Sequence, residues 1–239
     1  MSPGLLSVVL PCRDEAACVA RWPGELFGAL DALGRPWEAV AVDDGSRDAT
    51  LAALRALALG RPSLKVLAHA RGRGLGAALR TGFSAAAGDW IATLDADLTF
   101  APAQLRGLLA RQEETGADLV AGSPFLAAAG AARVPWRRRL PSLLLNACWR
   151  GLCGGQLTAY TPIFRLYRAS ALRGLRLESE GFEINAEIAA RFLAAGLRVA
   201  EAPAVLTARQ QGASKLSPLP QLWRHLRLAA RLRRGAGPP

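Results

Sequence analysis

The chain has 239 residues, of which 51% are hydrophobic and 21% are charged. This is enough for one sizeable domain or two small ones with a packed core, and the composition excludes intrinsic disorder. The formal net charge is +11, nearly all of it from arginine, and so basic a surface favours anionic partners such as nucleotides, phospholipid head groups or nucleic acid.

The sequence is also expected to lack membrane-spanning and secretory segments. No apolar run reaches the roughly 18 residues that a transmembrane helix requires. The start of the chain lacks the basic and apolar regions of a signal peptide. Cys12, Cys18, Cys148 and Cys153 form no CxxC pair and have no histidine at metal spacing, so we expect reduced thiols in a cytosolic protein.

Short apolar runs alternate with helical patterns along most of the chain. Strands are predicted at 5–10, 37–42, 64–67, 89–94, 117–121, 163–167 and 198–201. Helices are predicted at 15–33, 74–87, 103–115, 143–152 and 182–195. A further helix is predicted to end near residue 59 and to be capped at its start by Ser46 or Asp48. This alternation predicts an α/β domain over residues 1–217, with a mostly parallel central sheet flanked by helices.

Two segments depart from this rhythm. Residues 123–141 contain three prolines and the cluster Arg137-Arg138-Arg139, which predicts a mobile loop. Residues 218–239 form a basic amphipathic tail, in which Leu222, Trp223 and Leu226 follow helical spacing and arginines form another stripe. This tail is expected either on a membrane surface or on the domain's own surface.

Acidic residues follow two predicted strands. Asp43-Asp44-Gly45-Ser46 ends the strand at 37–42, where a carboxylate can accept hydrogen bonds from a base or a ribose, or simply form a turn. Asp95-Ala96-Asp97 ends the strand at 89–94. Two neighbouring carboxylates repel one another without a cation, and no basic residue is near, so we predict a site for Mg²⁺ or Mn²⁺.

Two basic, glycine-containing segments could bind phosphate. Gly72 lies in the loop Arg71-Gly72-Arg73-Gly74-Leu75-Gly76, which opens a predicted helix and could offer backbone N–H groups to an anion. Its spacing does not match a dinucleotide-binding fingerprint. Arg209 and the stretch Gly212-Ala213-Ser214-Lys215 could close over a diphosphate, or be a solvated linker.

In combination, these motifs resemble one enzyme family. Ser7 to Pro11 followed by Asp14-Glu15, then Asp43 to Ser46, Gly72 to Gly82 and Asp95 to Asp97 occur in the order typical of inverting family-2 glycosyltransferases with a GT-A fold. Residues 181–187, 199–203 and 212–216 resemble the branch of dolichol-phosphate mannose synthases and other polyprenyl-phosphate glycosyltransferases.

The resemblance implies a role for each matching residue. The nucleotide-sugar would contact Pro11, Asp14, Glu15, Asp43, Asp44, Gly72, Asp95, Ala96 and Ser214. Asp95 and Asp97 would be the metal-binding DxD pair, and Asp97, Arg209 and Lys215 would carry catalysis. The acceptor phosphate would be held by Trp136, Arg137, Arg138, Arg139 and Ser142.

Two positions depart from the branch. Thr99 stands where a glutamine often follows the DxD pair. The segment Ala159 to Arg165 lacks the acid and the glycine of the family's Asp-Pro-Thr-Ser-Gly-Phe-Arg sequence. These differences bear on the acceptor and the sugar more than on the fold.

The implied reaction moves a hexose, mannose or glucose, from GDP-mannose or UDP-glucose to a polyprenyl monophosphate. Neither histidine lies in a motif that marks a general base, and a phosphate acceptor needs none because it is largely dianionic at neutral pH. The expected location is peripheral, on the inner face of an anionic membrane, without a nucleic-acid partner. A hydroxyl acceptor with Glu187 or another carboxylate as base, and a non-catalytic nucleotide- or nucleic-acid-binding module, are the alternatives.

Overall fold

A seven-stranded sheet runs through the molecule in the order β3-β2-β1-β4-β6-β5-β7. The computed structural model describes residues 4–127, 136–207 and 218–235. The strands are β1 (Leu6–Cys12), β2 (Trp37–Asp43), β3 (Leu64–Ala68), β4 (Trp90–Thr93), β5 (Leu119–Ser123), β6 (Arg165–Arg168) and β7 (Val199–Pro203). All seven lie within a few residues of the predicted strands.

The sheet is mostly parallel, as predicted. β1 pairs in parallel with β2 and with β4, and β2 pairs in parallel with β3. β6 is antiparallel to both of its neighbours, β4 and β5, while β5 and β7 are parallel. The carboxyl ends of β1, β2 and β4 therefore meet at one edge of the sheet.

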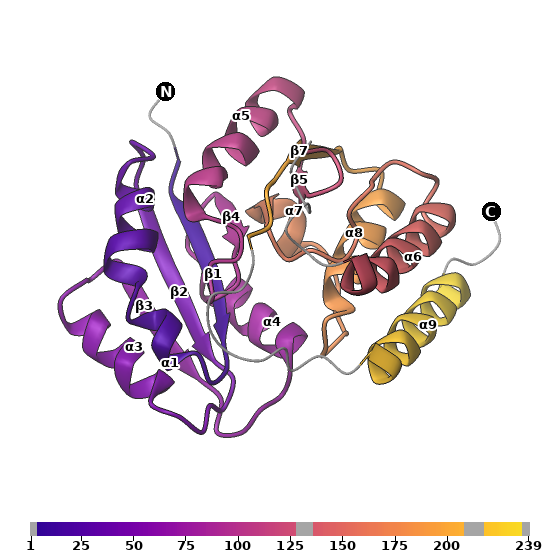
Figure 1. Ribbon diagram of the computed structural model, residues 1–239. Coiled ribbons are helices and arrows are strands. Elements are labelled where there is room, and N and C mark those ends of the chain that lie inside the picture. The colour runs from indigo at the N-terminus through magenta and orange to yellow at the C-terminus, as the bar shows by residue number, and fades with distance from the viewer. Residues whose placement is uncertain (1–3, 128–135, 208–217, 236–239) are drawn as a thin grey trace.

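Helices cover both faces of the sheet (Figure 1). In chain order they are α1 (Ala16–Val19), a π-helical turn (Pro23–Phe27), α2 (Gly28–Asp31), α3 (Thr50–Leu59), α4 (Leu75–Ala85), a 3₁₀ turn (Pro102–Gln104), α5 (Leu105–Thr115), α6 (Trp136–Leu152), α7 (Ala169–Arg173), α8 (Ile184–Ala194) and α9 (Pro218–Gly235). Within the described ranges, every helix is too short or too polar to span a lipid bilayer.

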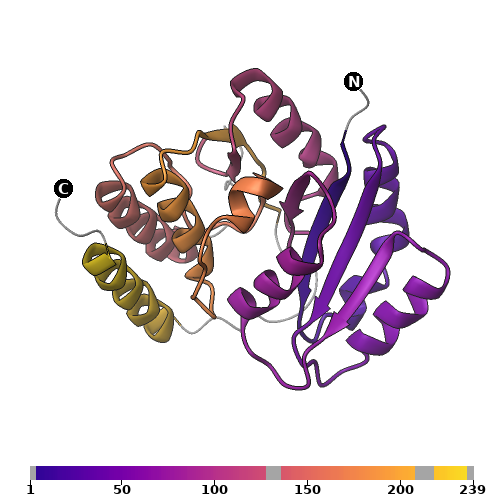
Figure 2. The ribbon, with the colours of Figure 1, turned by 180° about the vertical axis from the view of Figure 1, so that it is seen from behind.

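The core has two halves, one on each face of the sheet. Along β1, Leu6, Val8 and Leu10 face the half covered by α1–α3 and α5, whereas Val9 faces the half covered by α4 and α6–α9. This alternation follows the two-residue period of a strand. Figure 2 shows α4 packed on the sheet from the second side.

Two helix predictions need correction, and the structure decides between the two caps predicted for a third helix. The helix predicted over 15–33 is broken, because Pro23 cannot donate a backbone hydrogen bond and begins a π-helical turn. The segment predicted as a loop over 123–141 is helical from Trp136, and Pro141 is accommodated in its second turn. Ser46 does not cap α3; Asp48 instead accepts a hydrogen bond from the Thr50 backbone N–H at 2.9 Å.

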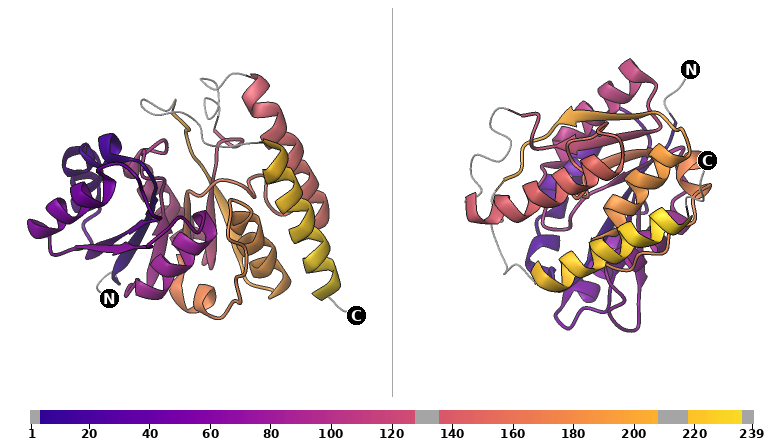
Figure 3. Two further views of the ribbon diagram at one scale, coloured as in Figure 1. Left: turned by 90° about the horizontal axis from the view of Figure 1, so that it is seen from below. Right: turned by 90° about the vertical axis from the view of Figure 1, so that its right-hand side faces the viewer.

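The C-terminal helix α9 packs beside α6 (Figure 3). Its His225 and Leu228 are buried, and His225 Nδ1 accepts a hydrogen bond from Trp149 Nε1 of α6 at 3.0 Å. Leu222, Trp223 and Leu226 point away from the core and are 47%, 64% and 52% exposed. The apolar stripe identified in the sequence is thus mainly outward-facing, and a different face of α9 contacts the domain.

Candidate active site

A cleft of about 790 Å³ lies at the edge of the sheet where β1, β2 and β4 end. Loops that follow parallel strands are the usual walls of ligand sites in such sheets. The sequence-predicted residues that line the cleft are Pro11, Asp14, Glu15, Asp44, Asp95, Ala96 and Asp97. Residues to which the sequence assigned no individual role also line it: Arg13, Arg47, Phe100, Phe125, Thr161, Phe182, Asn185 and Leu206.

Backbone-to-side-chain hydrogen bonds join the loops after β1 and β2. The Asp14 N–H donates to Ser46 Oγ at 2.8 Å, and the Arg47 N–H donates to Asp14 Oδ1 at 2.7 Å. The Glu15 N–H donates to Thr50 Oγ1 at 2.7 Å. Asp14 has a φ of 50°, a left-handed conformation that is uncommon for a residue other than glycine. The two loops therefore form one wall of the cleft.

The two aspartates of the Asp43-Asp44 pair have different surroundings. Asp43 is buried and does not line the cleft, which differs from the prediction. Its Oδ2 accepts a hydrogen bond from the Ser46 N–H at 3.2 Å, and its Oδ1 is buried without a hydrogen-bond partner. Burial without a partner is costly for a carboxylate oxygen, so a ligand donor that reached Oδ1 would be bound favourably.

Asp44 holds the glycine-rich loop. Its carboxylate accepts hydrogen bonds from the backbone N–H groups of Arg73 and Gly74, both at 2.8 Å, and lies 2.7 Å from His69 Nδ1. These two N–H groups are thus occupied by Asp44 and not directed at a phosphate. Asp44 also lies 3.5 Å from the guanidinium of Arg13.

Gly72 lies against the Arg13 side chain and not on the cleft wall, which differs from the prediction. It is absent from the cleft lining, and a Cβ atom there would collide with the Arg13 guanidinium. Gly72 therefore makes room for Arg13, whose side chain is 46% exposed at the cleft edge. The sequence offered no signal for Arg13 beyond its place between Pro11 and Asp14.

Asp95 and Asp97 both line the cleft just beyond β4. The Ala96 carbonyl between them accepts a hydrogen bond from the buried Trp22 Nε1 at 3.0 Å, and Asp97 Oδ1 accepts one from the Thr99 N–H at 3.1 Å. These contacts fix the turn, while the carboxylates supply the hard oxygen ligands that Mg²⁺ and Mn²⁺ prefer. No cluster of three or more His, Cys, Asp or Glu side chains suited to a metal was found in the described residues.

The chain returns to the cleft after β7. The Thr207 N–H and Oγ1 donate to the Thr99 carbonyl at 2.9 and 2.8 Å, and Leu206 forms a β-bridge with Phe100. Residue 207 therefore lies beside the Asp95–Asp97 turn. Arg209, Ser214 and Lys215, predicted to act on donor phosphates, lie outside the described residues.

The opposite wall of the cleft is held by buried polar groups. Asn146 Oδ1 of α6 accepts hydrogen bonds from the Tyr160 and Thr161 N–H groups at 2.6 and 3.2 Å. Arg165, which is fully buried, donates to the carbonyls of Asn185 and Tyr160 at 2.5 and 2.6 Å. These contacts fix the divergent segment 159–165 in place. Sequence reasoning missed Asn146, because one asparagine in an arginine-rich helix carries no local signal.

Glu187, the base named for a hydroxyl acceptor, does not line the cleft. It is fully buried and accepts hydrogen bonds from the Glu178 and Ser179 N–H groups and from Arg191. Burial alone would raise its pKa, but the hydrogen bonds from Ser179, Arg191 and Glu178 outweigh burial and lower the pKa. A buried carboxylate with a lowered pKa, whose oxygens accept these hydrogen bonds away from the cleft, is suited to structure and not to proton transfer, so Glu187 is not the base.

The predicted acceptor residues fall in the first two turns of α6. This helix begins at Trp136, so the backbone of Arg137, Arg138, Arg139 and Ser142 is helical. Their side chains lie outside the described part of the structure.

Comparisons with known proteins show the family to which the chain is similar. The model for glycosyl transferase family 2 matches residues 7–176. The chain is 34% identical over 222 residues to polyprenol monophosphomannose synthase of Mycolicibacterium smegmatis, covering 88% of this chain and 80% of that relative. It is 31% identical over 176 residues to undecaprenyl-phosphate 4-deoxy-4-formamido-L-arabinose transferase of Edwardsiella ictaluri, covering 71% of this chain and 51% of the relative.

A solved structure shares the fold. Glucosyl-3-phosphoglycerate synthase of Mycobacterium tuberculosis, crystallised with Mn²⁺, uridine diphosphate and phosphoglyceric acid, matches with a TM-score of 0.70 and 20% identity over 99% of this chain and 80% of that one. The predicted GT-A fold is thereby confirmed. The chain spans only about half the length of several of the curated relatives that it matches.

Proposed function

This chain belongs to glycosyltransferase family 2, and we propose that it moves a hexose from a nucleotide-sugar to a polyprenyl monophosphate. The observation that carries the proposal is the cleft at the ends of β1, β2 and β4, which Asp95 and Asp97 line together with Asp14 and Glu15. Mannose or glucose is the proposed sugar, with GDP-mannose or UDP-glucose as donor.

The donor would lie along this cleft. Its nucleoside would contact the wall formed by Pro11, Asp14 and Glu15, with the buried Oδ1 of Asp43 beneath as an acceptor for a base N–H. Arg13 and Arg47 add positive charge at the same edge, which suits the anionic diphosphate.

Asp95 and Asp97 would hold a Mg²⁺ or Mn²⁺ ion, which supplies charge neutralisation for the departing nucleoside diphosphate. Their side chains fit this role because both are carboxylates on the cleft wall and their turn is fixed by Trp22 and Thr99. The remaining oxygen ligands would come from the donor diphosphate and water.

The segment after β7 is proposed to close over the donor. Thr207 is anchored to Thr99, so the chain enters residues 208–217 directly beside the Asp95–Asp97 turn. Arg209 and Lys215 would then stabilise the leaving diphosphate, and Ser214 would contact the donor. These roles rest on the family resemblance together with the position of Thr207.

The proposed reaction is a direct displacement at the anomeric carbon. A phosphate oxygen of the acceptor forms the new bond from one face while the bond to the nucleoside diphosphate breaks on the other. A phosphate monoester is largely dianionic at neutral pH, so the attack requires no protein base. The structural role of Glu187 speaks against this residue as the base for a hydroxyl acceptor.

The acceptor is proposed to reach the cleft past the start of α6. Trp136, Arg137, Arg138, Arg139 and Ser142 would hold its phosphate, since arginine binds phosphate oxygens in pairs and tryptophan suits the boundary between head group and lipid. We further propose peripheral attachment to the inner face of an anionic membrane, supported by the exposed apolar side chains of α9 and the excess of arginine.

The test is transfer of labelled hexose from GDP-mannose and UDP-glucose to undecaprenyl phosphate, with Mn²⁺ and with EDTA. Mn²⁺-dependent appearance of label in the lipid extract supports the proposal. Label only in a water-soluble glycoside would favour a hydroxyl acceptor, and nucleotide binding without any transfer would favour a non-catalytic module.

A further inference from the structure

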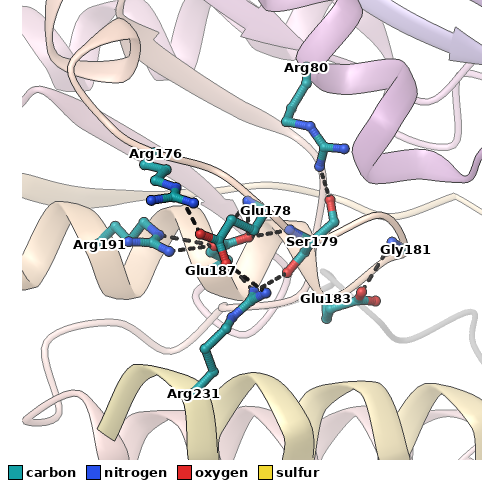
Figure 4. Close-up of polar contacts among 9 residues, drawn as sticks. All are labelled: Arg80, Arg176, Glu178, Ser179, Gly181, Glu183, Glu187, Arg191 and Arg231. Carbon is teal, nitrogen blue, oxygen red and sulfur yellow. Dashed lines mark hydrogen bonds and ion pairs between the residues drawn. The ribbon is translucent and has the colours of Figure 1, made fainter. Parts of the chain in front are cut away.

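The C-terminal helix α9 is attached to the domain by ion pairs as well as by apolar packing. Arg231 Nη1 lies 3.0 Å from Glu178 Oε2, and Arg231 Nη2 lies 3.4 Å from Glu187 Oε1 and 3.2 Å from Ser179 Oγ. Figure 4 shows this one guanidinium reaching from α9 to all three residues. Two of them, Glu178 and Ser179, belong to the loop between α7 and α8, residues 174–183, called here the α7–α8 loop.

The centre of this contact is Glu187, whose side chain is fully buried on α8. Its carboxylate accepts the Ser179 N–H at 2.8 Å and the Glu178 N–H at about 3.1 Å, and pairs with Arg191 at 2.9 Å. A buried carboxylate is stable only when its charge is compensated, so Arg231 and Arg191 together favour its ionised form. Ionised Glu187 in turn fixes the backbone of the α7–α8 loop.

A second arginine of α9 approaches the same loop. A Cβ atom added to Gly181 would collide with the guanidinium of Arg224 and approach the carboxylate of Glu183. The Gly181 N–H donates to Glu183 Oε1 at 3.1 Å. Gly181 is therefore a point where the Arg224 side chain of α9 closely approaches the loop, and a larger residue there would push aside the Arg224 and Glu183 side chains.

The other side of the α7–α8 loop contacts the cleft. The Glu180 carbonyl accepts the Gly76 N–H at 2.7 Å in the first turn of α4, and the Ser179 carbonyl accepts a hydrogen bond from Arg80 of the same helix. Phe182 lines the cleft and is 41% exposed. The loop thus lies between α9 and the cleft wall that Gly74 and Leu75 form at the start of α4.

From this chain of contacts we propose that Arg231 is a positioning residue for sugar transfer. By holding Glu178, Ser179 and Glu187, it sets the place of Phe182 and of the first turn of α4 in the cleft. It touches neither substrate nor metal and acts only through the α7–α8 loop. The effect of Arg231 on catalysis rests on the proposed function. The link between Arg231 and the α7–α8 loop does not, and it can be measured without a catalytic assay.

The test compares Arg231→Gln with Arg227→Gln in the full chain. Arg227 is exposed on the same helix, so the two variants lose the same charge. Amide hydrogen exchange is measured at Glu178, Ser179 and Gly76, and kcat and KM for the donor are measured in the transfer assay. Arg231→Lys is the second variant, since it keeps the charge but cannot bridge the three partners as a planar fork does.

We expect the three amides to exchange about tenfold faster in Arg231→Gln than in Arg227→Gln. The amides of β1 and β2 should exchange at the same rate in both variants. Transfer kcat/KM should fall about tenfold, and Arg231→Lys should recover part of both losses. If Arg231→Gln does not fold, the same comparison is made with Arg231→Lys. Equal exchange in Arg231→Gln and Arg227→Gln overturns the link; where Arg231→Gln does not fold, equal exchange in Arg231→Lys and Arg227→Gln does so. Faster exchange with unchanged transfer overturns the positioning role.

A failure of the proposed function gives a different result. In that case the wild-type chain transfers no sugar to any lipid acceptor, while the exchange difference between Arg231→Gln and Arg227→Gln persists.

Discussion

At the scale of single residues, the cleft brings together most of the acidic positions that the sequence indicated. Asp14, Glu15, Asp95 and Asp97 follow buried strands, and such strands are recognisable from their apolar runs. The exception is Asp43, which is buried beneath the cleft because the strand pairing with β3 extends through it. Neighbouring aspartates at a strand end point to opposite faces, and the sequence does not reveal which one faces the ligand.

Asp97→Ala is expected to lower transfer at least about 100-fold, because the diphosphate would lose its metal-mediated charge neutralisation. The stability loss should be about 1 kcal/mol, because the hydrogen bond from the Thr99 N–H is removed. Asp97→Asn is the matched variant, since it keeps an acceptor for Thr99 but not the charge. Turnover close to wild type in either variant, with Mg²⁺ or Mn²⁺ present, would remove the metal assignment.

The arginine cluster at the start of α6 provides a second residue-scale prediction. Changing Arg137, Arg138 and Arg139 to alanine should raise the acceptor KM about tenfold or more, because charge-assisted phosphate contacts are lost. Donor binding, measured by calorimetry, should be unchanged. Arg150→Ala, on the same helix, is the control. An unchanged acceptor KM would assign the cluster to a solvated surface.

At the scale of elements, the positions of the strands were predicted well, whereas the pairing of β6 and the docking of α9 were not. Strands such as β1 and β4 are buried on both sides and read as apolar runs, so sequence alone locates them. In contrast, the antiparallel insertion of β6 between β4 and β5 depends on contacts between segments far apart in the chain. The docking of α9 is of the same kind, since its buried face includes His225 and not the main apolar stripe.

The docking of α9 is expected to depend on pH through His225. Burial lowers the pKa of His225, although Glu183 acts in the opposite direction. Its folded pKa therefore lies below the unfolded value of about 6.5, so neutral His225 stabilises the fold fully above that pH. As the pH falls from about 6.5 towards the folded pKa, the unfolded state binds more protons and stability is lost, by at most about 1.4 kcal/mol per pH unit.

The measurement is the free energy of unfolding between pH 7.5 and 5.5 for wild type and His225→Asn. Asparagine keeps an acceptor for Trp149 Nε1 but does not titrate in this range. The free energy of unfolding of the variant should fall less between pH 7.5 and 5.5 than that of the wild type, because the contribution of His225 is absent. Parallel curves for the two proteins would show that His225 does not cause it.

At the scale of the whole molecule, the neighbouring helices α6 and α9 both expose apolar side chains. Leu222, Trp223 and Leu226 of α9 and Leu144 of α6 are exposed on neighbouring helices (Figure 3). Changing the three α9 residues to serine should weaken binding to anionic vesicles at least about tenfold, because their apolar side chains would no longer enter the bilayer. Stability should change little, since none of them is buried.

Leu59→Ser is the control, because Leu59 is 91% exposed and lies on α3, which packs beside the edge strand β3 and not beside α9. Vesicle sedimentation compares the two proteins. Equal binding would show that the outward face of α9 does not contact lipid.

The fold class and family could be predicted because the motifs of a GT-A domain occur in order along the chain, each after a recognisable strand. The coupling of α9 to the cleft could not, because Arg231, Glu178 and Glu187 become neighbours only when α8 and α9 pack. Family membership also leaves the acceptor open. Its chemistry, a lipid phosphate and not a hydroxyl, is the central claim.

That claim is tested most directly by comparing undecaprenyl phosphate with undecaprenol as acceptors, in the same detergent, with Mn²⁺ and the preferred donor. The two lipids share their chain and differ only in the nucleophile, so the comparison isolates the phosphate. The account predicts transfer to the phosphate and almost none to the alcohol, since the phosphate is largely dianionic at neutral pH whereas a hydroxyl needs a positioned base to remove its proton. Equal kcat/KM for the two lipids would contradict it.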